Sequence, residues 1–241
     1  AKLSESGAGV VLCGPKHLPV AMVLPFSGNS EVTRRVKYQI EAKKPVQKRL
    51  WQQVITAKIH AQARNLPPGS VERLRLETLA KQVRPGDPAN LEAQAARVYW
   101  RAWLGVGKPF KRNKNGGGLN AQLNYGYSVV RAAVARSLVS SGLYPALGIH
   151  HSNRSNAFCL ADDFLEPLRP LVDALARQLW FAGKKQLDRE TKGQLLSVLQ
   201  VSVRTGRHSG PLMIGLHRMT ASLVRCLRGQ QRNLVIPKVE E

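Results

Sequence analysis

The chain has 241 residues, 43% of them hydrophobic, which is enough to bury one sizeable core. Its 37 Lys and Arg face 15 Asp and Glu, so the formal net charge is +22. No apolar run approaches the roughly 20 residues that a membrane-spanning helix needs. Residues 20–26 are apolar but have no cleavage-site pattern, so we read no secretion signal there. This composition excludes an ordinary membrane protein and favours a polyanionic partner, above all nucleic acid.

The first segment has the pattern of two β-strands. Residues 9–13 and 18–24 are rich in β-branched and apolar residues, and the turn-like Gly14-Pro15-Lys16 separates them. The first residue is Ala1, and we interpret residues 1–27 as the remnant of an amino-terminal β domain whose first strands precede it. Residues 28–35, which follow a polar boundary, are expected to be a linker.

After this boundary the hydrophobic period becomes helical, and we expect an α-helical catalytic domain over residues 36–229. Pro45 suits the first turn of a helix that ends before residues 67–69, and Ser70 suits the cap of the next one. Asp87 and Pro88 are expected to open a further helix. Additional helices are expected from about 120 to 141, around 195–203 and over 212–227, followed by a C-terminal tail over 230–241. The predicted fold is therefore mostly α, a helical lobe behind a small β remnant.

The cysteines and the distribution of the basic residues indicate where in the cell the protein is expected and which polyanion it binds. The three cysteines lie far apart without a C-x-x-C pair, so neither a disulfide framework nor a zinc knuckle is indicated, and a reducing cytoplasm is the expected location. A membrane surface is the alternative partner for the basic residues. It fits poorly because no helix pairs a Trp- or Phe-rich face with a Lys-rich one.

The densest apolar-flanked carboxylate cluster is Asp162, Asp163 and Glu166. On a helix Glu166 can share a face with either aspartate, and two oxygen ligands on one face suit Mg²⁺ or Mn²⁺. His150 or His151 could add an imidazole ligand or transfer a proton. In the alternative interpretation, the aspartates cap the helix start and the histidines are ordinary hydrogen-bonded loop residues. Pro167 disfavours α geometry at Glu166, so a helix is expected to kink or begin there.

Several segments of the chain together resemble the CRISPR spacer-acquisition integrases of type II systems. The matching residues run in the same order as in that family and extend from the first strands to the last helices. They are residues 50–53, 58–59, 62–63, 90–96, 99–100, 123–127, 148–151 and 156–170.

The resemblance implies a site and a reaction. It places one divalent ion, Mg²⁺ or Mn²⁺, on Glu92, His151 and Glu166, with His151 preferred over His150 because the family's ligand stands three residues after the glycine that is Gly148 here. Asp163 matches a further acidic position. The implied reaction joins the 3′-hydroxyl ends of short DNA duplexes into the repeat array by transesterification, with DNA endonuclease activity besides. A homodimer and a small companion adaptation protein that bridges two dimers are the implied partners.

The charge and the resemblance also suggest which residues contact DNA, and two other functions remain open. One alternative is a metal-dependent endonuclease of repair or junction processing, because the same site offered water would cleave DNA. The other is a non-catalytic architectural DNA-binding protein, which would need no metal. The candidate phosphate contacts are Arg64, Arg97, Lys108, Lys111, Arg112, Arg131, Arg136, Arg154 and Arg169.

Overall fold

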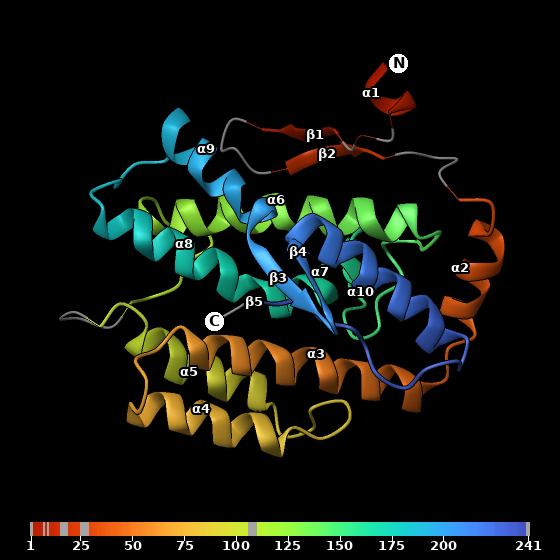
Figure 1. Ribbon diagram of the computed structural model, residues 1–241, viewed down its shortest axis with the longest axis horizontal. Coiled ribbons are helices and arrows are strands. Elements are labelled where there is room, and N and C mark those ends of the chain that lie inside the picture. Colours follow the sequence, from red (N-terminus) through yellow and green to blue (C-terminus); the bar gives the residue numbers. More distant parts are fainter. Residues whose placement is uncertain are drawn as a thin grey trace.

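Helices form most of the computed structural model, which describes residues 2–6, 8, 10–14, 19–24, 29–105 and 110–239. Figure 1 shows a β hairpin above a body of helices, with a small sheet on the near side of that body. The predicted fold class, mostly α with a small amino-terminal β element, is therefore confirmed. None of the helices in these ranges combines the length and apolar character needed to cross a membrane.

The amino-terminal segment forms a short helix, α1 (Lys2–Glu5), and two antiparallel strands, β1 (Val10–Cys13) and β2 (Pro19–Val23). The two predicted strands are thus confirmed. Met22 and Leu24 pack against the hydrophobic core, which holds the hairpin beside the helix α6 (Leu119–Ser140). The next helix, α2 (Val32–Ile40), begins inside the segment expected to be a linker, and the domain boundaries themselves stay predictions.

Three helices, α3 (Lys44–Arg64), α4 (Val71–Gln82) and α5 (Leu91–Ala102), pack together as one layer (Figure 1). A proline stands in the first turn of α3, and the Ser70 side chain caps α4 by accepting from the Arg73 N–H, as predicted. The start of α5 differs from the prediction, because the helix begins at Leu91 and Asn90 is its cap. Asp87 still serves this end, since its carboxylate accepts from the N–H groups of Leu91 and Glu92.

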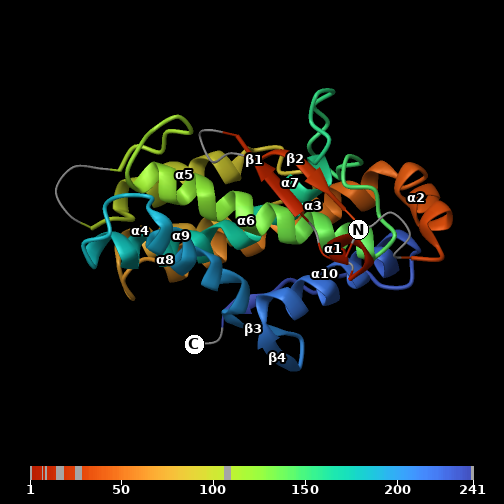
Figure 2. The same ribbon diagram turned by 90° about the horizontal axis from the view of Figure 1, so that it is seen from above.

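The second layer contains α6, α7 (Cys159–Leu165) and α8 (Arg169–Phe181), and a 3₁₀ turn, η1 (Glu166–Leu168), joins the last two. The predicted kink is confirmed here. Pro167 and Pro170 have no N–H to donate, so the α-helical hydrogen bonds cannot run through this point. Gly142, with φ +67°, follows the C-terminal end of α6 as expected. Figure 2 shows the loop that leads from α6 to α7 projecting from the body.

The carboxy-terminal part corrects one prediction. The helix expected around 195–203 is wrong: α9 (Arg189–Leu196) ends early, a 3₁₀ turn η2 (Ser197–Gln200) follows, and the chain then enters the strand β3 (Ser202–Thr205). Val203 and Thr205 are buried while their neighbours are exposed, and Gly206 makes the tight turn with φ +65°. This alternation has a period of two, which belongs to a strand.

The strand β4 (His208–Pro211), the helix α10 (Leu212–Leu227) and the short strand β5 (Lys238–Val239) complete the chain, and the sheet order is β4-β3-β5. The segment expected to be a tail therefore has structure over 230–239. The Leu234 N–H donates to Oε1 of Gln53 at 2.7 Å, and Ile236 packs against the core, so this segment runs back along α3.

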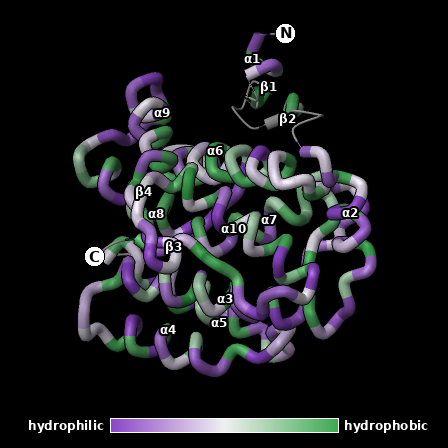
Figure 3. The backbone as a smooth tube through the Cα atoms, turned by 45° about the vertical axis from the view of Figure 1, so that its right-hand side comes forward, coloured by the Kyte–Doolittle hydropathy of each residue, from purple (hydrophilic) through white to green (hydrophobic). Residues whose placement is uncertain are grey.

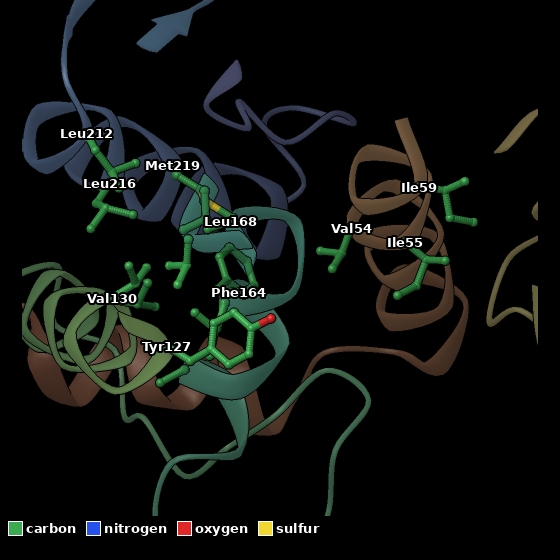
Figure 4. Close-up of a cluster of buried hydrophobic side chains, with 14 of the residues drawn as sticks. Val54, Ile55, Ile59, Tyr127, Val130, Phe164, Leu168, Leu212, Leu216 and Met219 are labelled. Carbon is green, nitrogen blue, oxygen red and sulfur yellow. The ribbon is translucent and has the colours of Figure 1, made fainter. Parts of the chain in front are cut away.

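The hydrophobic core joins α6, α7, η1 and α10. Figure 3 shows apolar and polar residues alternating along the helices, which is the pattern of helices that each bury one face. Figure 4 shows the side chains that meet in the centre, and the labelled members from these elements are Tyr127, Val130, Phe164, Leu168, Leu212, Leu216 and Met219.

A buried polar cluster ties α3, α5, α6 and α8 together. The Asp173 carboxylate accepts hydrogen bonds from the hydroxyls of Tyr99, at 2.9 Å, and Tyr127. Asn65 at the end of α3 donates to the Tyr99 oxygen at 3.0 Å. Burial raises the pKa of Asp173 to about 6, although the two tyrosine hydroxyls act in the opposite direction. The cluster thus contains a carboxyl group whose protonation is linked to folding.

Gly126 in α6 is expected to tolerate no side chain, because a Cβ there would lie inside contact distance of the Val172 side chain. Gly126→Ala should lower the free energy of unfolding by about 1–3 kcal/mol through overpacking. Gly193→Ala in α9 is the matched control, since nothing lies within 4 Å of its added Cβ. The control should gain about 0.5–1 kcal/mol from helix propensity. Urea denaturation measures both, and equal effects would contradict the packing argument.

Asp173→Asn should remove a pH dependence of stability. Folding raises this pKa from the ordinary 3.8 to about 6, so the folded chain binds the proton more tightly than the unfolded chain. The resulting stabilisation is complete below pH 3.8 and is lost as the pH rises through about 6. Between about pH 4 and about pH 7 the free energy of unfolding of the original protein, minus that of the variant, should fall by roughly 2 kcal/mol. Urea titrations across this range test it, and parallel profiles would count against a raised pKa.

Candidate active site

The predicted ligands Glu92 and Glu166 come from different layers and converge on one cation, the ammonium of Lys58. Lys58 lies on α3, Glu92 in the first turn of α5 and Glu166 at the start of η1. The Lys58 Nζ lies 2.5 Å from Oε1 of Glu92 and 2.6 Å from Oε2 of Glu166. The candidate site is therefore the place where these three elements meet.

Glu166 is a buried carboxylate held between two cations. Its other oxygen, Oε1, accepts from Nε of Arg169 at 2.9 Å, and only 8% of its side chain is exposed. Burial alone would raise the pKa of Glu166, but the charges of Arg169 and Lys58 outweigh this and hold it at about 2. The group is thus an anion throughout the physiological pH range.

Glu92 is placed by the local structure that starts α5. Asn90 in the left-handed region caps the helix, and Oδ2 of Asp87 accepts from the N–H of Glu92 itself at 2.9 Å. The carboxylate stands in the first turn of α5, beside the positive end of the helix dipole, where a negative charge stabilises the helix. The Glu92 side chain is 27% exposed, so it stands at the open side of the site.

Asp163 shapes the loop that carries the histidines. Its fully buried carboxylate accepts from the backbone N–H groups of Ile149, His150 and His151, at 2.7–3.1 Å. A Cβ at Gly148 would collide with the carbonyl of His151, so this tight loop requires glycine. Asp163 therefore organises a loop. No side chain caps α7 by a hydrogen bond, although Asp162 does lie in its first turn, where the alternative interpretation placed a negative charge.

The same carboxylate orients His151. The His151 Nδ1 lies 2.6 Å from Oδ1 of Asp163, and this hydrogen bond, despite partial burial, raises the pKa of the imidazole. The bond uses Nδ1 and leaves Nε2 for a ligand or a proton. Trp51 of α3 supports the pair, because its ring stacks on His150 at 4.0 Å and meets His151 edge-on at 5.6 Å. Burial lowers the pKa of His150.

The donor atoms gathered here are of the kind that a divalent cation prefers. Within the described ranges no three His, Cys, Asp or Glu side chains stand in the geometry of a metal site. However, two carboxylates from separate elements share one cation, the Lys58 ammonium. Oxygen donors with an oriented imidazole beside them suit Mg²⁺ or Mn²⁺.

The candidate DNA contacts fall into two groups. The side chains of Arg112, Arg131 and Arg169 donate to protein acceptors. Arg131 in particular holds Asp162 and Asn156. Of the remaining candidates, Arg97, Lys111 and Arg154 are exposed and Arg136 is half-buried. Arg64 lines a groove of about 920 Å³ between α3 and the carboxy-terminal segment, and Lys108 lies outside the described residues.

Sequence reasoning assigned no role to Lys58 or Trp51, and it expected Asp87 to open a helix without indicating that its carboxylate would bind the N–H of Glu92. One signal could have revealed Lys58, because it follows Val54 and Ile55 at helical spacing and so lies on the buried face of α3. A lysine at such a position needs a buried anionic partner. Nothing in the local sequence indicates which carboxylates these are.

Comparison with known proteins places this site in a family. The model of the family described as CRISPR associated protein Cas1 matches residues 1–199. A CRISPR-associated endonuclease Cas1 from Neisseria meningitidis is 38% identical over 224 residues, which are 91% of this chain and 73% of that protein. One from Pyrobaculum aerophilum is 33% identical over 161 residues, which are 63% of this chain and 52% of that protein.

Two solved structures show the same fold. A casposase bound to its integration product has a TM-score of 0.80 at 19% identity, and the match covers 99% of this chain and 77% of that one. A Cas1 protein from Thermotoga maritima has a TM-score of 0.75 at 18% identity, with 99% and 83% covered. Together with the family model and the Neisseria relative, these findings show that the chain belongs to the Cas1 family of CRISPR-associated enzymes, as its motifs predicted.

Proposed function

We propose that this protein is the metal-dependent DNA integrase of a CRISPR adaptation system, which joins the 3′-hydroxyl ends of short DNA duplexes into the repeat array and also cleaves DNA. The observation that carries the proposal is the convergence of Glu92 and Glu166 on one cation position beside an oriented histidine. Family membership supports it, since the Neisseria and Pyrobaculum relatives are named endonucleases. One structure with this fold is described as a casposase bound to an integration product.

The proposed reaction is a phosphoryl transfer. The 3′-oxygen of the incoming strand forms a bond to phosphorus, and the bond from phosphorus to a 3′-oxygen of the target strand breaks. The attacking hydroxyl loses its proton and the leaving oxygen takes one up, so the number of phosphodiester bonds is unchanged. Mg²⁺ or Mn²⁺ on Glu92, His151 and Glu166 would supply Lewis-acid activation of the hydroxyl and offset the charge that develops on the phosphate. Asp163 holds the His151 ring in place, and Arg169 keeps Glu166 charged and positioned.

The proposed partners follow from charge and family. A net charge of +22 favours double-stranded DNA through counterion release. Arg97, Lys111 and Arg154 are the exposed candidates for phosphate contacts, and Arg64 would act from its groove. We also propose a homodimer, two copies of which are bridged by a small companion protein, and a cytoplasmic location. One structure with the same fold is described as a complex of Cas6-RT-Cas1 with Cas2.

A nuclease of repair or junction processing is the second candidate. The same cluster can activate water in place of a 3′-hydroxyl, and the arrangement of Glu92 and Glu166 favours neither nucleophile. An architectural DNA-binding protein is less well supported, because surface charge alone needs no buried carboxylate such as Glu166.

Glu166→Gln is expected to abolish strand transfer, because the amide keeps the size of the side chain but removes the charge. A labelled duplex, a plasmid with leader and repeat, Mn²⁺ and the companion protein form the assay. Joined product should fall roughly a hundredfold or more. Glu190→Gln, an exposed carboxylate on α9 paired with Lys184, is the matched control and should remain active.

The products of this assay separate the three functions. Joined product that disappears with chelator and in Glu166→Gln supports the integrase, and short cleaved fragments without joining would indicate the nuclease. Binding that needs no metal, without any reaction, would indicate the architectural protein.

DNA binding is expected to depend steeply on salt. A protein that neutralises roughly 6–10 phosphates should lose about a thousandfold in affinity between about 50 and about 200 mM salt. Arg154→Ala should reduce the slope of log K against log salt by about one. Lys184→Ala, whose ammonium pairs with Glu190, should leave the slope unchanged. Fluorescence anisotropy with a labelled duplex measures this, and a nearly flat salt profile would argue against phosphate binding.

A further inference from the structure

Lys58 is the buried cation at the centre of the candidate site. Only 10% of its side chain is exposed, and its ammonium contacts both carboxylates at 2.5 and 2.6 Å. Two carboxylates within hydrogen-bonding distance compensate the buried ammonium. Lys58 therefore places a cation where the two proposed metal ligands meet.

The charges of this cluster cancel. Glu92 and Glu166 contribute two negative charges, while Lys58 and Arg169 contribute two positive ones through the contacts described above. Each oxygen of Glu166 already faces a cation. A divalent ion that joined this arrangement unchanged would add two positive charges to a neutral, largely buried cluster, which is unfavourable.

The two cations are held differently. Arg169 stands three residues after Glu166, its guanidinium also lies 4.6 Å from the centre of the Tyr127 ring, and it follows the kink that sets its direction. Lys58 reaches the site on a flexible four-carbon stem, and its ammonium donates hydrogen bonds to the two carboxylates. Lys58 is thus the cation that can leave without repacking the core.

We propose that Lys58 is a tethered counter-ion, which keeps Glu92 and Glu166 together in the metal-free protein and which a divalent cation must displace in order to bind. This inference rests on the proposed function, because it takes the two carboxylates as ligands. It assigns to Lys58 two opposite effects: the residue stabilises the protein without metal and weakens the binding of the metal.

Bound DNA would also change the charge balance of this cluster. When the ion displaces the Lys58 ammonium from the carboxylates, the positive charge of the ammonium remains close to the ion. A phosphodiester of the DNA then supplies the negative charge that balances it. Metal and DNA should therefore bind with positive coupling, each raising the affinity of the other by the same factor. Without Lys58 the metal binds well alone, and the coupling becomes smaller.

The test measures Mn²⁺ binding to the full chain, by titration calorimetry or by the electron paramagnetic resonance signal of free Mn²⁺. Lys58→Met keeps the length of the side chain and removes its charge. This variant should bind Mn²⁺ roughly tenfold or more tightly than the original protein in the absence of DNA. Lys48→Met, an exposed position on the same helix, is the control and should bind as the original protein does.

Stability gives a second, independent readout. In chelator, Lys58→Met should melt at a lower temperature than the original protein, because two carboxylates lose their shared partner. Mn²⁺ should then raise the melting temperature of the variant by more than that of the original protein. Lys58→Gln, which keeps hydrogen-bond donors without the charge, provides the same comparison should the methionine variant not fold.

The outcomes are distinguishable. Equal or weaker Mn²⁺ affinity in the variants would overturn the role of Lys58 and leave the integrase proposal standing. If the original protein and every variant fail to bind Mn²⁺ even with a substrate duplex, the metal-dependent function is itself overturned. Tighter binding in Lys58→Met and Lys58→Gln, with the Lys48 control unchanged, establishes displacement.

Discussion

A buried carboxylate at Glu166 is the constraint on which this site depends. With 8% of its side chain exposed, the group has lost most of its hydration, and it stays charged because Lys58 and Arg169 each face one oxygen. The compensation requires three elements to lie together: α3 brings Lys58, η1 brings Glu166, and the start of α8 brings Arg169. The charge of Glu166 is therefore compensated only when the two helical layers pack against each other.

The kink shows how local chemistry sets this geometry. Pro167 and Pro170 interrupt the helical hydrogen bonds directly after Glu166, so α7 and α8 are separated by one 3₁₀ turn. Arg169 then lies one turn beyond Glu166 and packs over Tyr127, whose hydroxyl donates to Asp173. The buried polar cluster of the core thereby supports the cation that holds the carboxylate.

Local signals in the sequence predicted much of the architecture. The cap at Ser70 and the kink at Pro167 could be predicted because each residue acts on the backbone of its own segment. The strand β3 was not, because Val203 is an apolar residue that suits a helix or a strand, and its pairing partners lie in β4 and β5. The proposed ligands Glu92, His151 and Glu166 came from the family resemblance, whereas the partners that orient them depend on contacts between distant segments. Asp163 illustrates this, since its spacing from Glu166 suggested a ligand or a cap but did not indicate that its carboxylate would organise the loop around His151.

The net charge of the whole chain and the near-zero charge of the four-residue cluster both affect how a phosphate approaches the site. A cluster of bare carboxylates would repel the phosphate that must approach it, and the repulsion is strongest where the dielectric is low. The net charge of +22 draws a polyanion to the surface but does not remove this local barrier, because charges beyond about 10 Å are screened. Lys58 and Arg169 remove it at the site itself, since each lies within hydrogen-bonding distance of a carboxylate oxygen. The near-neutral cluster therefore repels an approaching phosphate less than two bare carboxylates would.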